Sequence, residues 1–269
     1  MNRKPMKIFI EGVGVLGPGL NGWSASQPIL SGTAPYADTP IVIPPNDLLP
    51  SAERRRTGIP VKLALAVGSE AIAHSQRKAD ELPTVFASSS GDGNNMHHIF
   101  DMLAHNGREV SPTRFHNSVH NAPSGYWSIA TRSMAPSTSL ACFDWSFAAG
   151  LLEAATQSLE SGNPVALISY DAPYPQPLHA TRPISATFGV ALVLFVKWSE
   201  RSLAGVEIAI SRSSKPVTTS AHPGLETVRS GTPAARSLPL LSVLAKHSSA
   251  EIHLDYITGN QVDVTIQPC

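Results

Sequence analysis

The stretch SLACFDWSFAAGLLEA, residues 139–154, joins a short strand-like run to the beginning of a helix. It places Cys142 near the helix entrance, where the positive end of the helix dipole can lower the pKa of a thiol. Activated cysteines are found in such settings, so the first question is whether Cys142 is a nucleophile. The helix is expected over 145–161, because one stripe carries the small and apolar residues Phe147, Gly150, Leu151, Ala154, Ala155 and Leu159.

The rest of the chain alternates between strand-like and helix-like segments. Apolar or alternating runs predict strands over 7–15, 83–87, 164–170, 188–198 and 205–211, and a closing hairpin that turns at Gly259-Asn260. Helical periodicity predicts helices over 60–78 and 234–246, and one with the apolar face Met96, Ile99, Phe100 and Leu103. The forty residues after the first strand, and residues 213–232, are expected to be irregular. This order predicts an α/β layered domain with a mostly parallel sheet.

Charge and composition exclude several classes of function. The 269 residues contain 20 Lys plus Arg and 20 Asp plus Glu, a balance that gives no electrostatic footprint for nucleic acid or an anionic membrane. A hydrophobic content of 42% is sufficient for a large core. The apolar run near the N-terminus is broken by Glu11, several glycines and Pro18. Neither a targeting signal nor membrane insertion is therefore expected.

No cofactor or metal is expected either. The two cysteines, Cys142 and Cys269, fit neither a disulfide framework nor a metal spacing, which suits a reducing cytoplasm. The loop SSSGDGNN at 88–95 follows a strand but contains neither a GxxxxGK(S/T) nor a GxGxxG pattern, so no nucleotide site is predicted. His97 and His98 are adjacent and point apart, which is poor geometry for a metal.

Two further patterns leave alternatives open. The charge run ERRR at 53–56 is interpreted as a solvated surface or, alternatively, as a docking patch for an acidic partner. His116 and His120 are four residues apart without a suitable third ligand, so local hydrogen bonds are favoured over a zinc site. The same histidines could instead serve an acyltransferase or thioesterase whose nucleophile is Cys142 or Ser146. No recognised pattern joins nucleophile, base and orienting group in that alternative.

Several segments together resemble the β-ketoacyl synthases. IFIEGVGVLGPG resembles their opening strand, and NAPSGYWSIATRSMAPSTS resembles their Asn-x-x-x-Gly helix before a Gly-Pro-Ser turn. SFAAGLLEAATQSLESGNPVALISYDAP resembles their buried nucleophile helix and the following strand, and FGVALVLFV the strand that completes the first half. The resemblance implies a truncated thiolase-like α/β fold, with a complete ketosynthase-like half over 1–200. Residues 201–269 would then be a reduced second portion of the same domain.

Two segments resemble one branch of that family more closely. SVHNAPSGYWSIAT and SYDAPYP are similar to the short ketosynthase-like proteins of aryl polyene and xanthomonadin pigment clusters. Those proteins resemble chain-length factors, the partners of catalytic ketosynthases in type II polyketide and fatty-acid-like synthesis. The resemblance implies a heterodimer or heterotetramer with a catalytic ketosynthase homologue, and it allows contact with an acyl carrier protein.

The resemblance also implies where a ketosynthase nucleophile would stand. Counted forward from Pro136-Ser137 the position is Asp144, and counted back from Gly162 it is Trp145, so Cys142 lies two or three residues early. Asp144 is expected to cap the helix, and its charge disfavours a thiolate nearby. Cys142 is expected to be a small buried apolar residue.

The remaining parts of a ketosynthase site are not recognised in the sequence. Family members use two histidines from the second half of the fold, but His222, His247 and His253 stand in no Gly-Thr-x-Thr or Gly-His setting. The resemblance therefore implies a non-catalytic subunit with no catalytic residues of its own.

Two physical expectations accompany this interpretation. Phe143, Trp145 and Phe147 are expected to fill the former pocket at the helix entrance. A half-size thiolase fold is also expected to leave broad apolar sheet and helix surface, which a homologous partner would cover.

Overall fold

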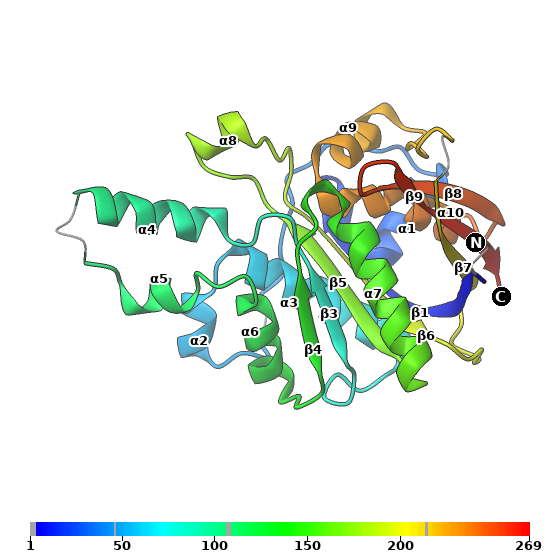
Figure 1. The fold of residues 1–269 in the computed structure, drawn as a ribbon, viewed down its shortest axis with the longest axis horizontal. Coiled ribbons are helices and arrows are strands. Elements are labelled where there is room, and N and C mark those ends of the chain that lie inside the picture. Colours follow the sequence, from blue (N-terminus) through cyan, green and yellow to red (C-terminus); the bar gives the residue numbers. More distant parts are fainter. Residues whose placement is uncertain (1–3, 46, 106–108, 213–214) are drawn as a thin grey trace.

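The computed structural model describes residues 4–45, 47–105, 109–212 and 215–269. Its centre is one mixed sheet with the strand order β4-β3-β5-β6-β1-β7-β9-β8, and the short β2 pairs with the end of β1 (Figure 1). The strands are β1 Met6–Gly17, β2 Leu20–Asn21, β3 Thr84–Ala87, β4 Ser137–Leu140, β5 Val165–Asp171, β6 Phe188–Phe195, β7 Ala204–Ser211, β8 Ala250–Tyr256 and β9 Asn260–Pro268.

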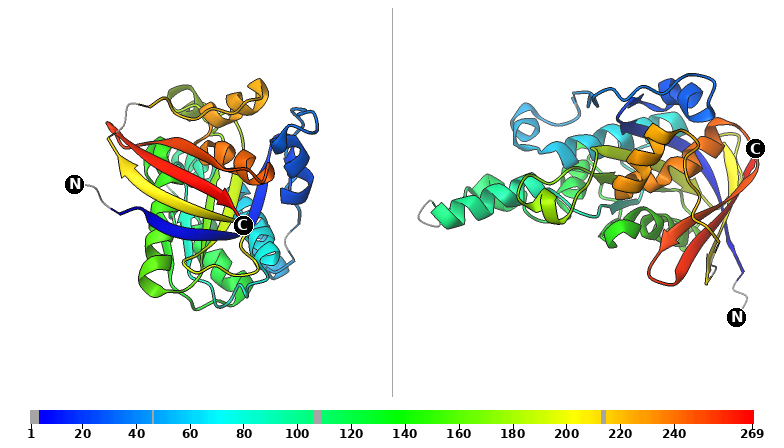
Figure 2. Two further views of the ribbon diagram at one scale, coloured as in Figure 1. Left: turned by 90° about the vertical axis from the view of Figure 1, so that its right-hand side faces the viewer. Right: turned by 90° about the horizontal axis from the view of Figure 1, so that it is seen from above.

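Helices cover both faces of the sheet over β3, β5 and β6, which gives three layers there, whereas β7, β8 and β9 contribute to the core on one face only (Figures 1 and 2). The α-helices are α1 Trp23–Ser31, α2 Ser51–Arg56, α3 Ile59–Ser75, α4 Gly93–His105, α5 Pro112–His116, α6 Ala122–Thr131, α7 Ser146–Ser161, α8 Leu178–Thr181, α9 Pro223–Gly231 and α10 Leu238–Ala245. Two 3-10 turns, η1 Phe143–Trp145 and η2 Pro233–Ser237, precede α7 and α10. Within the described residues, no helix is both long and apolar enough to span a bilayer.

The apolar core is divided in two by the sheet. Val165 and Leu167 of β5 belong to the cluster formed with α1, α7 and α10, whereas Ala166, Ile168 and Tyr170 belong to the cluster formed with α3 and α6. All of these side chains are buried. Successive residues of a strand point to opposite faces, so a near-continuous apolar run is what a strand covered on both sides needs. The prediction of an α/β layered domain is confirmed.

The strand directions correct the prediction of a mostly parallel sheet. Among the strand pairs of the described residues, only β3–β4 and β3–β5 are parallel. The central strand β6 runs antiparallel to both of its neighbours, β5 and β1, and the pairs β1–β7, β7–β9 and β8–β9 are also antiparallel. The direction of β6 cannot be recognised in the sequence, because a strand buried on both faces has the same apolar run whichever way it points.

Two segments expected to be irregular contain helices. The first forms α1 and α2, and 213–232 contains α9, while residues 213–214 lie outside the described part. Trp23 and Leu30 of α1 are buried against the core, with Gly22 and Gly32 at its two ends. Gly22 and Gly32 bound α1, Pro28 lies inside it, and tertiary packing supplies the stabilisation that local propensity lacks.

The expected apolar surface lies elsewhere than predicted. Both sheet faces are covered over the two core clusters, so the prediction of a broad uncovered apolar sheet face is wrong. Helices α4 and α5 instead form an arm that projects from the body (Figures 1 and 2). Of the apolar face predicted for α4, Ile99 is buried, whereas Phe100 and Leu103 are exposed, as are Phe115 of α5 and Val119 just beyond it.

Candidate functional site

The candidate site is the entrance of α7, beside the C-terminal ends of β3, β4 and β5. β4 leads through Cys142 and the turn η1 into α7, the loop 88–92 follows β3, and the segment 172–187 follows β5. Because β3 is parallel to both β4 and β5, the three connections leave the sheet at the same end of these strands (Figure 1). Catalytic groups of open α/β sheets are placed at this end.

Ser146 organises the turn into the helix. Its hydroxyl accepts a hydrogen bond from the backbone N–H of Cys142 at 3.0 Å and donates one to the carbonyl of Phe143 at 2.8 Å. Phe143 has a φ of 50°, a left-handed conformation that is uncommon for residues with a side chain. Ser146 itself is fully buried. Its hydroxyl therefore holds a strained turn closed and does not face an open cavity.

Asp144 is part of an ion-pair cluster, and the prediction that it caps α7 is wrong. Its carboxylate lies 2.5 Å from the Arg182 guanidinium and 3.4 Å from that of Arg236. Arg236 is also 3.3 Å from Asp255. The residue that precedes α7 is Trp145, and it makes no side-chain capping bond. Two arginines from later segments attract the carboxylate more strongly than the helix N–H groups do, because a full charge outweighs the partial charge of a helix end.

Arg182 connects all three segments at the helix entrance. Besides the ion pair with Asp144, its guanidinium donates a hydrogen bond to Ser89 Oγ at 2.8 Å. It also stacks on the Phe143 ring, with the guanidinium carbon 3.8 Å from the ring centroid. A guanidinium is suited to this combination, because its plane can stack on a ring while its edge donates hydrogen bonds.

Asp171, the last residue of β5, forms the buried floor beneath this cluster. Its Oδ1 accepts hydrogen bonds from the Ser89 N–H at 2.8 Å, Ser88 Oγ at 3.2 Å and Ser90 Oγ at 3.4 Å, and Oδ2 accepts one from the Ala234 N–H at 2.9 Å. Complete burial raises the pKa of Asp171 to about 7, although these hydrogen bonds work in the opposite direction. Asp171 thereby ties the loop after β3 to η2.

Cys142 lies at the edge of this cluster. It is half-buried, which corrects the prediction of a fully buried residue. Burial raises the pKa of the thiol above its usual value. Among the described residues no cation forms an ion pair or hydrogen bond with Cys142, because the two nearby arginines are paired with carboxylates. The thiol is therefore held in its less reactive, protonated form at neutral pH.

The histidines singled out in the sequence make local contacts. A ring nitrogen of His120 lies 3.0 Å from the Ser88 carbonyl, and His116 packs edge-on against the Tyr126 ring. No hydrogen bond joins either histidine to Cys142 or Ser146 within the described residues. In the same part of the chain no group of three or more His, Cys, Asp or Glu is arranged to hold a metal.

The three histidines after residue 200 also have structural partners. His222 accepts a hydrogen bond from the Gly224 N–H at the start of α9, and His253 Nδ1 lies 2.7 Å from Asp263. His247 follows the end of α10 with a φ of 47°, and its backbone N–H donates a hydrogen bond to the Leu244 carbonyl at 3.1 Å. No hydrogen bond or ion pair connects them to the α7 entrance in the described residues.

The aromatic residues near the entrance do not act as one plug. Phe147 is buried in the core, but Phe143 is largely exposed and lies under Arg182. Trp145 has intermediate exposure and lies next to Phe143, with ring centroids 6.3 Å apart. The prediction that three aromatic side chains fill a pocket is therefore wrong for Phe143.

Sequence reasoning missed Arg182, Arg236 and Asp171. The signal for a partner was the charge of Asp144 itself, because a carboxylate beside a buried helix needs a counter-charge. Arg182 is the only basic residue besides His179 in the proline-rich segment 172–187 that follows β5. That position could have suggested it, whereas nothing local to η2 pointed to Arg236.

Comparison with known proteins identifies the family. Residues 23–256 match the family described as "Beta-ketoacyl synthase, N-terminal domain". The chain belongs to this family. The match includes the α7 entrance and most of the segment after residue 200, and it confirms the resemblance found in the sequence. No curated protein matches the chain.

Solved structures with this β-ketoacyl synthase fold resemble nearly the whole chain. A chain of the ketosynthase ApeO in complex with its chain length factor ApeC from Xenorhabdus doucetiae is 21% identical, with a TM-score of 0.72. This similarity covers 96% of the present chain and 99% of that one. A chain of the ishigamide ketosynthase/chain length factor is 14% identical, with a TM-score of 0.71 and coverage of 97% and 99%.

A third similar structure contains a carrier protein. It is AntDE:AntF (apo), a type II PKS acyl-carrier protein in complex with its ketosynthase bound to the hexaketide. The matched chain is 10% identical, with a TM-score of 0.73 and coverage of 99% of the present chain and 100% of that one. These similarities confirm the predicted thiolase-like ketosynthase fold.

Proposed function

We propose that this chain is a non-catalytic, chain-length-factor-like subunit that pairs with a catalytic β-ketoacyl synthase. Residues 1–200 form its ketosynthase-like half and residues 201–269 a reduced second portion of the same domain. The pair acts in cytoplasmic type II polyketide or fatty-acid-like synthesis of the kind that yields aryl polyene pigments.

The observation that carries this proposal is the ion-pair cluster at the α7 entrance. We assign the degenerate nucleophile position to Asp144 and Trp145. A ketosynthase needs a thiolate there, generated next to positive charge. In this chain the carboxylate of Asp144 is paired with Arg182 and Arg236, so the local positive charge is already neutralised. Neither Cys142, with its raised pKa, nor the buried Ser146 replaces the missing nucleophile.

The similar structures support a ketosynthase partner. Two of them contain a ketosynthase and a chain length factor, and a third contains an acyl carrier protein with its ketosynthase. The exposed apolar side chains of the α4–α5 arm give a partner a surface to bury. The proposal includes contact with the carrier protein only as a consequence of pairing. The carrier protein has to reach the catalytic subunit, and this chain would lie beside that subunit in the pair.

Pairing is tested by co-expression with a catalytic ketosynthase from the same genome. We expect the two chains to co-purify and to give a single complex in native mass spectrometry, whose mass defines the stoichiometry. A ketosynthase variant without its nucleophilic cysteine should pair equally well, because pairing requires no chemistry. A soluble monomer that does not bind the ketosynthase would contradict the proposal.

The absence of chemistry is tested on the purified chain alone. Incubation with an acyl-loaded carrier protein should leave its intact mass unchanged. In Cys269→Ser, iodoacetamide should alkylate Cys142 about tenfold or more slowly than it alkylates the exposed Cys269 in Cys142→Ser, because the half-buried thiol of Cys142 is less ionised. Covalent acylation, or rapid stoichiometric alkylation of Cys142, would favour the acyltransferase or thioesterase alternative.

A further inference from the structure

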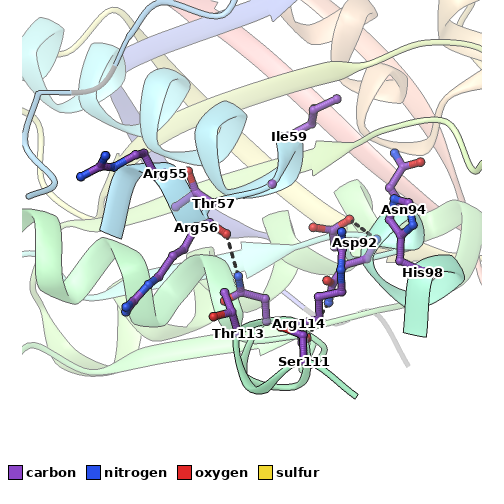
Figure 3. A pocket seen from close by; sticks show the side chains of 13 residues that line it. Arg55, Arg56, Thr57, Ile59, Asp92, Asn94, His98, Ser111, Thr113 and Arg114 are labelled. Carbon is purple, nitrogen blue, oxygen red and sulfur yellow. Dashed lines mark hydrogen bonds between the residues drawn. The ribbon is translucent and has the colours of Figure 1, made fainter. Parts of the chain in front are cut away.

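A polar cavity lies away from the α7 entrance, at the base of the α4–α5 arm. Its volume is about 560 Å³. One wall comes from α2 and the start of α3, with Arg55, Arg56 and Thr57, and the opposite wall from the start of α4, with Asp92 and His98 (Figure 3). Arg114 of α5 lies between the two walls, beside Asp92 (Figure 3).

The charges that line this cavity are mainly positive. Three arginines and one carboxylate line it, and Arg56 also pairs with Glu53 at 3.2 Å. One positive charge therefore remains in excess when both carboxylates are counted. The Arg114 guanidinium makes no hydrogen bond with the described residues, and its charge acts on Asp92 through space.

The start of α3 adds to this positive potential. α3 is a helix of 17 residues that begins beside the cavity, and no side chain caps it at Gly58. The positive end of the helix dipole therefore points toward the space between the walls. A Cβ at Gly58 would come within 2.2 Å of Asp92 Oδ2, so the Asp92 carboxylate lies close against the start of α3.

Buried side chains fix the backbone that carries the arginines. Asn117, only 7% exposed, donates a hydrogen bond to the Arg56 carbonyl at 2.8 Å, and Tyr126 donates one to Asn117 Oδ1 at 3.0 Å. Asn95, 8% exposed, donates one to the Arg114 carbonyl at 2.8 Å. Such support holds charged residues in place before a ligand arrives, which reduces the entropy lost on binding.

We propose that this cavity binds a phosphate group, carried as a monoester or diphosphate by a small molecule. Guanidinium groups bind phosphate oxygens with two parallel hydrogen bonds, and Arg114 has its donors available for them. The volume lies within the roughly 300–1,000 Å³ usual for small-molecule sites, so the organic part of such a ligand has room. The proposal assigns a role to the arginine run at 53–56 that the ketosynthase-like function does not use.

The test measures binding of inorganic phosphate and of pyrophosphate by calorimetry and thermal shift, with chloride at equal ionic strength as the reference. We expect millimolar or tighter binding, weakened about tenfold or more in Arg114→Ala and partly in Arg114→Lys, which keeps the charge but loses the paired hydrogen bonds. Asp92→Asn should bind more tightly, because one repelling charge is removed.

The control is Arg201→Ala, which removes an exposed arginine outside this cavity and should bind like the unmodified protein. If Arg114→Ala does not fold, the test rests on the other two variants: Arg114→Lys should weaken phosphate binding and Asp92→Asn should strengthen it. Absence of phosphate binding at about 10 mM, or binding that Arg114 and Asp92 variants leave unchanged, would overturn the proposal. None of these outcomes depends on whether the chain pairs with a ketosynthase.

Discussion

Asp144 illustrates how one charged residue changes the chemistry of a helix entrance. Its carboxylate occupies the positive potential that could otherwise lower the pKa of a thiol, and it recruits Arg182 and Arg236 from segments far along the chain. The Asp144 and Arg182 side chains are 29% and 24% exposed, so solvent screens the pair only partly. The pair is therefore expected to stabilise the fold as well as to suppress reactivity.

A double-mutant cycle measures this ion pair. Asp144→Ala, Arg182→Ala and the double variant should show a coupling free energy of about 1–2 kcal/mol in urea unfolding, because the two charges lie 2.5 Å apart in a partly desolvated setting. The matched control is the exposed pair Lys78 and Glu81, at 2.7 Å, which should show much weaker coupling. Equal coupling in the two cycles would show that the cluster is only a solvated surface pair.

At the level of elements, α7 depends on a close approach to the sheet. A Cβ at Gly150 would come within 2.7 Å of Ala87 Cβ on β3 and within 2.8 Å of Leu167 Cδ1 on β5. Glycine therefore sets the distance between the helix and the sheet, and with it the place where η1 presents Asp144. The small-residue stripe visible in the sequence is explained by this packing.

A pair of glycine substitutions separates packing from helix propensity. Gly150→Ala should destabilise the protein by about 1–2 kcal/mol, because overpacking against β3 and β5 outweighs the gain in propensity. Gly125→Ala in α6 should be neutral or stabilising by up to about 1 kcal/mol, because nothing lies within 4 Å of the added Cβ. Urea midpoints measure both. Stabilisation by Gly150→Ala would mean that α7 can move away from the sheet without cost.

At the scale of the whole molecule, Asp171 links the loop after β3, the end of β5 and η2. These three segments come from residues 88–90, 171 and 234 and meet only in the folded state. Burial raises the pKa of Asp171 to about 7 in the folded protein, from an ordinary value of 3.8. The folded state therefore holds this proton more tightly than the unfolded state does.

The sign of the pH dependence follows from this shift. The contribution of Asp171 to the free energy of unfolding is fully present below pH 3.8 and is lost as pH rises to about 7. Over this range the free energy of unfolding falls by up to about 1.4 kcal/mol per pH unit. Asp171→Asn cannot titrate, so the difference in unfolding free energy between unmodified protein and variant should shrink from pH 5 to pH 7. Other carboxyl groups with raised pKa values, such as Glu70 and Asp92, cancel in that difference. Parallel pH profiles would contradict the raised pKa.

The sequence alone determined the order of the main strands and helices, the apolar run of β5 and the small-residue stripe of α7. These are local patterns of period and composition, and they survive folding because burial on one or both faces imposes them. The family resemblance placed Asp144 and Trp145 at the helix entrance, but the helix-capping argument gave Asp144 the wrong partner. A cap is a contact with neighbouring residues, and sequence reasoning naturally prefers near partners.

Only the tertiary structure decided the direction of β6, the helical state of α1 and α9, and the cluster that joins Asp144 to Arg182 and Arg236. Arg182 is 38 residues from Asp144 along the chain. It reaches the carboxylate because the parallel strands β4, β3 and β5 bring their following segments to the same end of these strands. Contacts of this kind depend on how strands pair, and no local pattern of charge or hydrophobicity records that pairing.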